Sequence, residues 1–458
     1  MNSTQITALV IILVYMAVTV AIGLFASRKK TEEKQSNDDF LMASKSLGPV
    51  VLAGTLFAAN TGGASTTGIA TNVFQYGLSA SWYVIAGGIG FVLVSFIAPY
   101  FRRAQANTVP EIISKRYGKA SHIFTAFTSI SALFMATGAQ FIATASIINV
   151  VTGFDFETAA IVSTIVVVIY TMFGGFKSVT ATNLMHVLFI TVGMTIAMFV
   201  MVNNPEVGGF GALFEKARAM QDAAGNNMNI LSMTKIGGTT IIGYIAMYFM
   251  TFPTGQEIVQ TYCSAKDGKS AKLGSILAGL VSAAYAIVPA IIGLLAYVCI
   301  DGYVLAGSQK NALAQATITF APSILAGVVL AAIVAATMSS ASGNMIGTAT
   351  MFTNDVFTPY INKGVKDDKK EIWISKVTML VVGVVGLFIA LKASNVISVM
   401  MGAFALRSAG PFAAFICGLF CKNVTKRAGF ISILVGTIVA AIWIYVLDTP
   451  GGLNAMVP

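Results

Sequence analysis

Charged residues are scarce in this sequence. They make up 10% of its 458 residues, and only 18 are acidic, against 28 Lys and Arg. Soluble domains usually carry about 25% charged residues, whereas this chain is 56% hydrophobic with a mean hydropathy of +0.81. Such a composition excludes an ordinary water-soluble fold and indicates that the solvent is a lipid bilayer. The bases form no stripe suited to nucleic acid, so no nucleic-acid partner is expected.

Cysteine and histidine are also rare, at four and two residues. Cys417 and Cys421 share one helix face, but His122 and His186 are distant in sequence. The simpler interpretation is therefore a pair of small buried side chains rather than a metal site. No nucleophile–base pair or phosphate-binding loop stands at a usable spacing, which argues against an enzyme.

Long apolar runs dominate the chain instead. A membrane-spanning helix needs about 20 apolar residues, and about twelve such runs predict an all-α protein that crosses the membrane many times. The runs cover residues 5–27, 48–75, 80–101, 121–151, 156–173, 178–202, 237–261, 271–300, 321–354, 372–392, 395–420 and 428–447. The polar segment 203–236 is expected to be a surface loop with a short helix.

The distribution of Lys and Arg predicts the orientation. Bases gather in alternate loops, and the first of these loops carries Arg28, Lys29, Lys30, Lys34 and Lys45. The positive-inside rule places these loops in the cytoplasm. Both chain ends and the loop 203–236 then face outside, and the protein is expected in the cell membrane as a multi-pass protein.

Two of the apolar runs contain helix-breaking residues. Gly62 and Gly63 interrupt the second run, and Pro253 and Gly255 interrupt the seventh. Broken backbone inside a bilayer is tolerated only where protein or a wet cavity satisfies the freed polar groups. Two interrupted helices at corresponding positions indicate an inverted-repeat transporter, although Gly and Pro are common in membrane helices generally.

The repeats would divide the chain into five parts. Residues 1–47 would form an extra N-terminal helix with its cytoplasmic loop, and 48–202 the first five-helix repeat. The extracellular loop 203–236 would separate it from a second five-helix repeat, 237–420, and residues 421–458 would add an extra C-terminal helix.

Four segments carry a resemblance to a known family. They are TVPEIISKRYG (108–118), YTMFGGFKSVTATNLMHVLF (170–189), GQEIVQTYCSAKDGKSAKLG (255–274) and GLFCKNVTKRAGFISILVG (418–436). In this order they resemble segments of the solute:sodium symporter family, whose members carry proline, pantothenate, sialic acid or sugars. The resemblance implies a LeuT-like five-plus-five inverted repeat that imports a small organic solute with Na⁺ by alternating access. We expect the functional unit to be a monomer.

The resemblance also suggests where Na⁺ binds. The segment AATMSSASGNM (335–345) resembles the family's sodium half-site, with the carbonyl of Ala336 and the hydroxyls of Ser339 and Ser340 as ligands. The carbonyls of Ala58 and Thr61, at the first helix break, would complete the site. The alternative is that the paired serines only hydrogen-bond to carbonyls one turn earlier.

Some positions depart from the family pattern. Asn183 replaces a common Asp, and Gly343 stands where members with a second sodium site have a hydroxyl. These changes predict one Na⁺ per cycle.

Thr261 replaces the usual Arg after Gln260. Because His186 lies close to Asn183, a proton-coupled or uncoupled transporter of the same fold remains the alternative.

The solute site is expected near the bilayer midplane, between the two interrupted helices. Its candidate residues are Asn60, Gly62, Ser65, Thr66, Gln140, Thr251, Phe252, Thr254 and Arg407. The glycine pair exposes backbone N–H donors that suit a carboxylate. Helix–helix packing is the alternative role for each polar residue. The run from Gly62 to Ser65 differs from that of sugar symporters, so a sugar is less expected.

Arg407 is the most informative single residue. A cation within a membrane span costs at least about 2.5–3.5 kcal/mol and is usually paired or functional. Its planar guanidinium fits a carboxylate, which favours an amino acid or organic acid as the solute. The alternatives are a salt bridge with Glu257 or an extended side chain that reaches the outer surface. Asp355, near a helix end, is expected at the membrane interface.

Overall fold

A computed structural model describes residues 1–28, 47–104, 108–223, 229–300, 308–393, 395–421 and 423–447. Its regular elements are helices, and one isolated parallel bridge joins Leu47 to Ala265. The fold class predicted from the sequence, all-α, is therefore confirmed for these residues. The first cytoplasmic loop and the C-terminal tail lie largely outside the described residues, as do the side chains of residues 173–184, including Asn183.

The described residues of the N-terminal half form thirteen helical elements. They are α1 (Ser3–Arg28), α3 (Pro49–Asn60), η1 (Ala64–Gly68), α4 (Ile69–Tyr76), η2 (Gly77–Ser81), α5 (Trp82–Val94), α6 (Ala98–Ala104), α7 (Val109–Tyr117), α8 (Lys119–Thr152), α9 (Phe156–Leu188), η3 (Phe189–Gly193), α10 (Met194–Val202) and α11 (Gly209–Ala223). The short helix expected in the loop 203–236 is thus present as α11.

The C-terminal half repeats the pattern of long and interrupted helices. Its elements are α12 (Gly238–Thr251), η4 (Phe252–Thr254), α13 (Gln256–Cys263), α14 (Gly268–Tyr285), α15 (Ile287–Cys299), η5 (Gln309–Asn311), α16 (Ala312–Phe320), α17 (Ser323–Met351), η6 (Phe352–Ile361), α18 (Asp368–Lys392), α19 (Val396–Ser408), α20 (Pro411–Phe420) and α21 (Lys426–Tyr445).

Helix starts are fixed by side-chain caps. Thr108, Asp155 and Asp267 precede α7, α9 and α14, and each accepts a hydrogen bond from a backbone N–H of the first turn. Such caps satisfy N–H groups that have no partner within the helix. Gly118 and Gly153, with φ of 84° and 77°, end α7 and α8, because a left-handed conformation suits glycine.

Seven helices of the described residues are long and apolar enough to cross a membrane, or eight if the bent pair α19–α20 counts as one span. Shorter apolar helices cover Ser3–Thr19, Pro49–Asn60 and Phe156–Met172. The twelve predicted spans are therefore not confirmed as a count. The predicted spans 156–173 and 178–202 correspond to the apolar helices Phe156–Met172 and Met185–Val202, although the backbone between them, through Gly174 and Gly175, is helical as part of α9. No proline stands there, and glycine alone weakens a helix without ending it.

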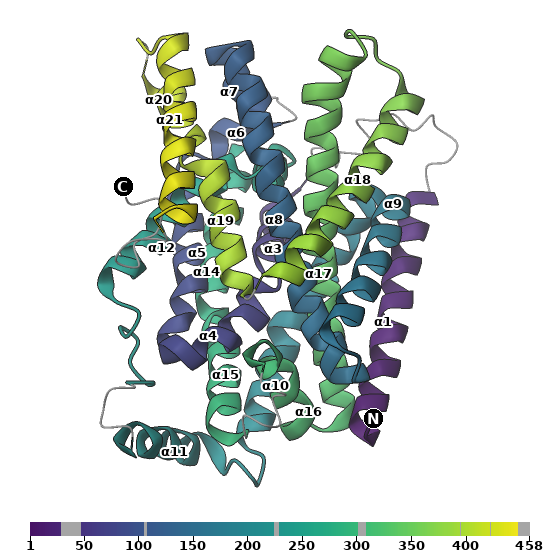
Figure 1. Cartoon of the computed structure of the whole chain (residues 1–458), viewed down its shortest axis with the longest axis vertical. Coiled ribbons are helices and arrows are strands. Elements are labelled where there is room, and N and C mark those ends of the chain that lie inside the picture. Colours follow the sequence, from purple (N-terminus) through teal and green to yellow (C-terminus); the bar gives the residue numbers. More distant parts are fainter. Residues whose placement is uncertain are drawn as a thin grey trace.

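The helices form one bundle (Figure 1), in which α17 packs against α1, α8, α9 and α18. The N-terminus and α11 lie at the same end of the bundle, and the connection between α17 and α18 lies at the opposite end (Figure 1). This arrangement agrees with the orientation predicted from Lys and Arg, which placed the N-terminus and the loop 203–236 together outside.

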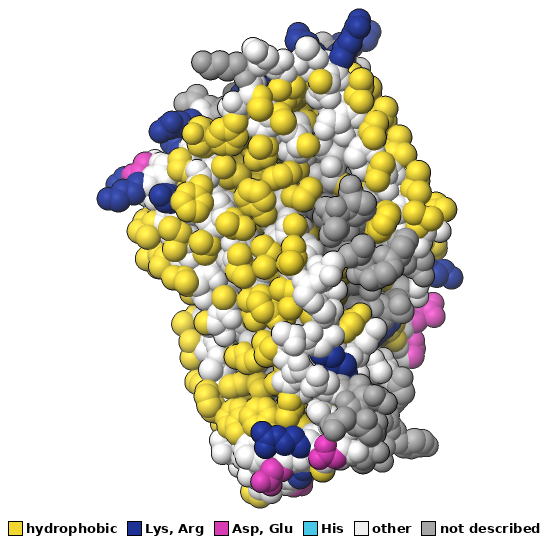
Figure 2. Space-filling model, turned by 90° about the vertical axis from the view of Figure 1, so that its left-hand side faces the viewer, with side chains coloured by type: hydrophobic (Ala, Val, Ile, Leu, Met, Phe, Trp, Pro, Cys, Tyr) yellow, Lys and Arg dark blue, Asp and Glu magenta, His cyan; other side chains and the backbone are white. Residues whose placement is uncertain are grey.

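The exterior of the bundle is apolar. Figure 2 shows hydrophobic side chains over the middle of one face, while most Lys and Arg side chains lie towards its ends. Large apolar side chains such as Trp373, Val384 and Phe388 on α18 are more than half exposed. An exposed apolar surface of this extent suits a hydrocarbon environment rather than water.

Candidate functional site

The first interrupted helix is broken where the sequence predicts. Helix α3 ends at Asn60, Thr61 has a non-helical φ of −100° and ψ of 76°, and a π-helical turn, η1, follows Gly63. Side chains satisfy the freed backbone groups: the Gly63 N–H donates to Gln140 Oε1 at 2.7 Å. The Ser65 hydroxyl donates to the Asn60 carbonyl at 2.7 Å. Protein groups therefore hold this break open inside the bundle.

The glycine pair lets α8 approach this break closely. A Cβ added at Gly62 would overlap Gln140, and one at Gly63 would overlap the Cβ of Ala143. The glycine pair therefore makes room for a neighbouring helix at the break. The Gly63 N–H, considered as a donor to a solute carboxylate, is already hydrogen-bonded to Gln140.

The second interrupted helix is also broken where the sequence predicts. Helix α12 ends at Thr251, one 3₁₀ turn follows, and Gly255 adopts an extended φ of −84° and ψ of 118° before α13 begins. The Thr254 hydroxyl donates to the Met250 carbonyl at 3.1 Å. A Cβ at Gly255 would lie 2.8 Å from Arg407 Nη2, so glycine leaves room for the guanidinium.

Arg407 pairs with Glu257 across this second break. Arg407 Nη1 donates to Glu257 Oε1 at 2.6 Å, and the two side chains are 4% and 17% exposed. Arg407 Nε also donates to the Thr251 hydroxyl at 3.3 Å, and the guanidinium lies 4.8 Å from the centre of the Phe404 ring. The salt bridge considered as an alternative is confirmed, and an Arg407 side chain extended to the outer surface is wrong.

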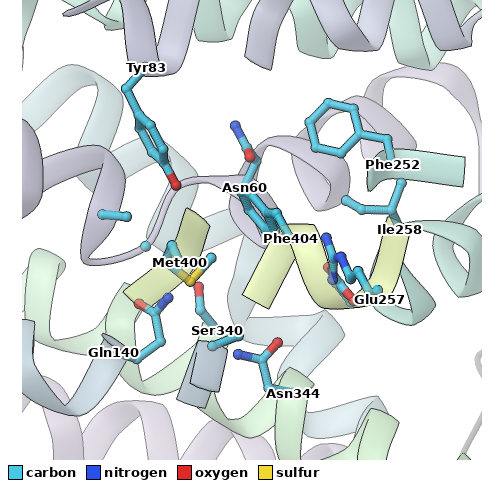
Figure 3. A pocket seen from close by; sticks show the side chains of 15 residues that line it. Asn60, Tyr83, Gln140, Phe252, Glu257, Ile258, Ser340, Asn344, Met400 and Phe404 are labelled. Atoms are coloured by element: carbon cyan, nitrogen blue, oxygen red, sulfur yellow. The ribbon is translucent and has the colours of Figure 1, made fainter. Parts of the chain in front are cut away.

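A cavity lies between the two breaks (Figure 3). Its volume is about 20 Å³, which is room for about one water molecule. A solute therefore needs the surrounding helices to move apart before it can enter. The lining residues are Ala59, Asn60, Gly62, Ala64, Tyr83, Ala136, Gln140, Phe252, Glu257, Ile258, Ser340, Asn344, Met400, Phe404 and Arg407.

The candidate solute residues divide into two groups. Those that line the cavity are Asn60, Gly62, Gln140, Phe252 and Arg407. The hydroxyls of Ser65, Thr66, Thr251 and Thr254 instead donate to backbone carbonyls, which is the packing role considered as their alternative.

Sequence reasoning missed several lining residues. Phe404 and Met400 precede Arg407 by three and seven residues, so they share its helix face. Asn344 follows Ser340 by one turn and lies beside it in Figure 3. Helical spacing from the predicted residues would have found all three. Tyr83 is on α5 and carries no such signal.

The candidate sodium residues lie on α17, on α3 and, for Thr61, at the break directly after α3; these two helices are in contact. Ala336 and Ser339 are buried, at 4% and 6% exposure, and Ser340 lines the cavity. The hydroxyl oxygens of Thr61 and Ser340 are buried without a hydrogen-bond partner in the described part of the chain. Ala58, on the last turn of α3, is partly buried. Buried oxygens without partners are suited to bind a cation.

The remaining polar groups have mainly structural contacts. His122 Nε2 lies 2.7 Å from Asp355 Oδ1, which also accepts from the Thr108 hydroxyl at 3.0 Å. Asp355 is only 3% exposed, and these hydrogen bonds tie it to α8 and to the residue that caps α7. His186 Nδ1 lies 3.1 Å from the Tyr15 hydroxyl. Among the described residues, no group of three or more His, Cys, Asp or Glu could hold a metal.

Comparisons with known proteins agree with this architecture. The chain is 25% identical to the sodium/glucose cotransporter of Vibrio parahaemolyticus over 92% of its length and 82% of the relative's. It is 26% identical to the high-affinity proline transporter PutP of Bacillus subtilis, over 92% of this chain and 89% of PutP.

Solved structures show the same fold. An outward-open sodium-coupled sialic acid symporter superposes with a TM-score of 0.78 at 19% identity, over 98% of this chain and 95% of that one. MhsT in complex with L-phenylalanine superposes with a TM-score of 0.57 at 11% identity, over 89% of this chain and 99% of MhsT. These neighbours are LeuT-like transporters, as the resemblance implied, and transporters of this kind are not enzymes.

The sequence also matches the sodium:solute symporter family over residues 40–436. This match covers both interrupted helices, the cavity between them and the serine pair on α17. The chain is therefore a multi-pass membrane transport protein that belongs to the sodium:solute symporter family.

Proposed function

We propose that this chain imports a small organic solute together with Na⁺ by alternating access. The observation that carries the proposal is the cavity between two interrupted helices, with the buried, unpartnered hydroxyl of Ser340 in its wall. Interrupted helices at the bilayer midplane supply backbone and side-chain groups for ion and solute. The proposal includes twelve spans, inverted repeats at 48–202 and 237–420, and a monomeric functional unit.

One Na⁺ would bind between α3 and α17. Its ligands would be the carbonyls of Ala58, Thr61 and Ala336 and the hydroxyls of Ser339 and Ser340. Unwound carbonyls and helix hydroxyls are the ligands that sodium symporters use. At Gly343 a side chain would meet no atom within 4 Å, so packing does not demand glycine there, and the missing hydroxyl supports a single site.

The solute would occupy the cavity after the helices separate. Asn60, Gln140 and Phe252 would contact it, and Arg407 would bind a carboxylate group. The guanidinium of Arg407 offers a carboxylate an ion pair that a neutral sugar cannot form, so a charged wall favours an ionic solute. Among the relatives, this favours the chemistry of the proline transporter over that of the glucose cotransporter.

Ligand-induced stabilisation tests the coupling ion and the solute class together. The purified protein would be heated with amino acids, organic acids, sugars or vitamins, each in Na⁺ and in K⁺. A ligand that binds only the folded state raises the melting temperature. Stabilisation that requires Na⁺ is expected. Uptake into proteoliposomes that is unchanged when K⁺ replaces Na⁺ would instead favour the proton-coupled or uncoupled alternative.

Replacing Ser340 with Ala should weaken sodium binding. The loss of one oxygen from a site of about five is expected to raise the apparent sodium dissociation constant by about tenfold or more. Sodium titration of the thermal shift measures this change. Ser342→Ala is the matched control, because Ser342 lies on the same helix but hydrogen-bonds to Thr171 at 2.7 Å. Equal effects of the two substitutions would contradict the assignment.

A further inference from the structure

Glu257 has one carboxylate oxygen that the protein leaves unused. Its Oε1 accepts from Arg407 at 2.6 Å, whereas its Oε2 is buried and has no hydrogen-bond partner among the described residues. The side chain forms part of the cavity wall. A buried acceptor without a donor is costly and is therefore prepared to accept one from a ligand.

The charges of the cavity wall are balanced. Among the described lining residues, Glu257 is the one acid and Arg407 the one base, and they pair with each other. The guanidinium has five N–H donors, and its bonds to Glu257 and Thr251 use two of them. Each member of the pair thus keeps capacity for a ligand of opposite charge.

This unused hydrogen-bonding capacity discriminates between classes of solute. A simple organic anion would meet the free donors of Arg407 but would leave the buried Glu257 Oε2 without a donor, and a simple cation would do the reverse. A buried charged acceptor without a donor is unfavourable. A zwitterion adds no net charge and offers each member of the pair a group of opposite sign.

We propose that Glu257 is a specificity-determining residue that binds the ammonium group of a zwitterionic solute, while Arg407 binds its carboxylate. The inference rests on the proposed symport function and narrows its solute class to amino acids and related zwitterions. Glu257 Oε2 would accept from the ammonium group, and the unused Arg407 donors would contact the carboxylate. Neither contact requires the salt bridge to break first.

The unaltered protein can test the inference with matched ligands. Each of the twenty amino acids would be screened by thermal shift in Na⁺. The best binder would then be compared with its 2-hydroxy acid, an anion of nearly the same size, and with its amide, a cation. Removing either charge should weaken binding by on the order of 10- to 100-fold, because each analogue keeps a hydrogen-bonding group but loses the charge that pairs with Glu257 or Arg407.

A substitution then assigns the ammonium contact to one residue. Glu257→Gln should reduce the preference for the amino acid over its 2-hydroxy acid towards unity, because the amide no longer offers a negative charge. Glu111→Gln is the matched control, since Glu111 is a partly exposed acid on α7 that pairs with Lys115 one turn away. The control should keep the wild-type preference.

The outcomes separate this inference from the broader function. Sodium-dependent stabilisation by organic anions or sugars, with all zwitterions inactive, would overturn the role of Glu257 while leaving sodium symport intact. A Glu257→Gln variant that keeps the wild-type preference for the amino acid over its 2-hydroxy acid would also overturn the role of Glu257. If no solute acts in a sodium-dependent way, the proposed function itself fails. If the variant does not fold, the comparison of the amino acid with its 2-hydroxy acid and its amide on the unaltered protein still tests whether the solute must be a zwitterion.

Discussion

The salt bridge between Arg407 and Glu257 predicts a large energetic coupling between these residues. Both side chains are well shielded, at 4% and 17% exposure, and the 2.6 Å distance indicates a charge-assisted hydrogen bond. Removing one partner from a buried pair costs about 3–5 kcal/mol, because the other charge stays buried without compensation. Glu257→Gln and Arg407→Met should therefore each destabilise the fold by about this amount.

The double substitution should cost much less than the sum of the two single ones. Replacing a buried pair with neutral groups of similar size is often nearly neutral in stability. We therefore expect a coupling energy of about 3 kcal/mol or more, obtained from free energies of unfolding measured by denaturant titration in detergent.

The exposed pair of Glu111 and Lys115 supplies the control cycle. These groups lie 3.4 Å apart one helical turn from each other, with side chains 36% and 52% exposed. Surface pairs of this kind couple by about 0.3–0.5 kcal/mol. A coupling no larger than this between Arg407 and Glu257 would refute the view that the two charges depend on each other inside the bundle.

Two other contacts predict the effects of single substitutions. Gly63→Ala would press a methyl group into Ala143 of α8 and should destabilise the protein by about 1–3 kcal/mol in the same denaturant titration; an unchanged midpoint would show that the helices do not approach so closely. Thr108→Ala removes the cap that accepts from the Glu111 N–H at 3.1 Å and the hydroxyl that donates to Asp355, and should cost about 1–2 kcal/mol, whereas Thr108→Ser keeps both bonds and should cost little.

The sequence alone predicted the features that depend on local chemistry. Runs of about 20 apolar residues require a membrane, whatever their neighbours. The glycine pair at 62–63 and the Pro253–Gly255 segment predicted both helix breaks, because these residues disfavour or interrupt a helix wherever they occur. The family resemblance was confirmed by the match over residues 40–436.

The sequence was less reliable where an outcome depends on a distant partner. The sequence showed Asp355 near a helix end but not its partners, His122 and Thr108, which lie more than two hundred residues away along the chain. The hydroxyls of Ser65 and Thr66 suggested solute contacts, yet carbonyls freed by the helix break accept their hydrogen bonds.

Composition and periodicity thus determined by themselves that this chain is a helical membrane protein with two interrupted helices, since apolar runs and helix breakers act through their immediate neighbours. Only the tertiary structure decided that Arg407 pairs with Glu257, that the pair lines a cavity with Ser340, and that one oxygen of Glu257 lacks a partner. Those facts depend on which helices meet, and 150 residues separate the two charged groups along the chain.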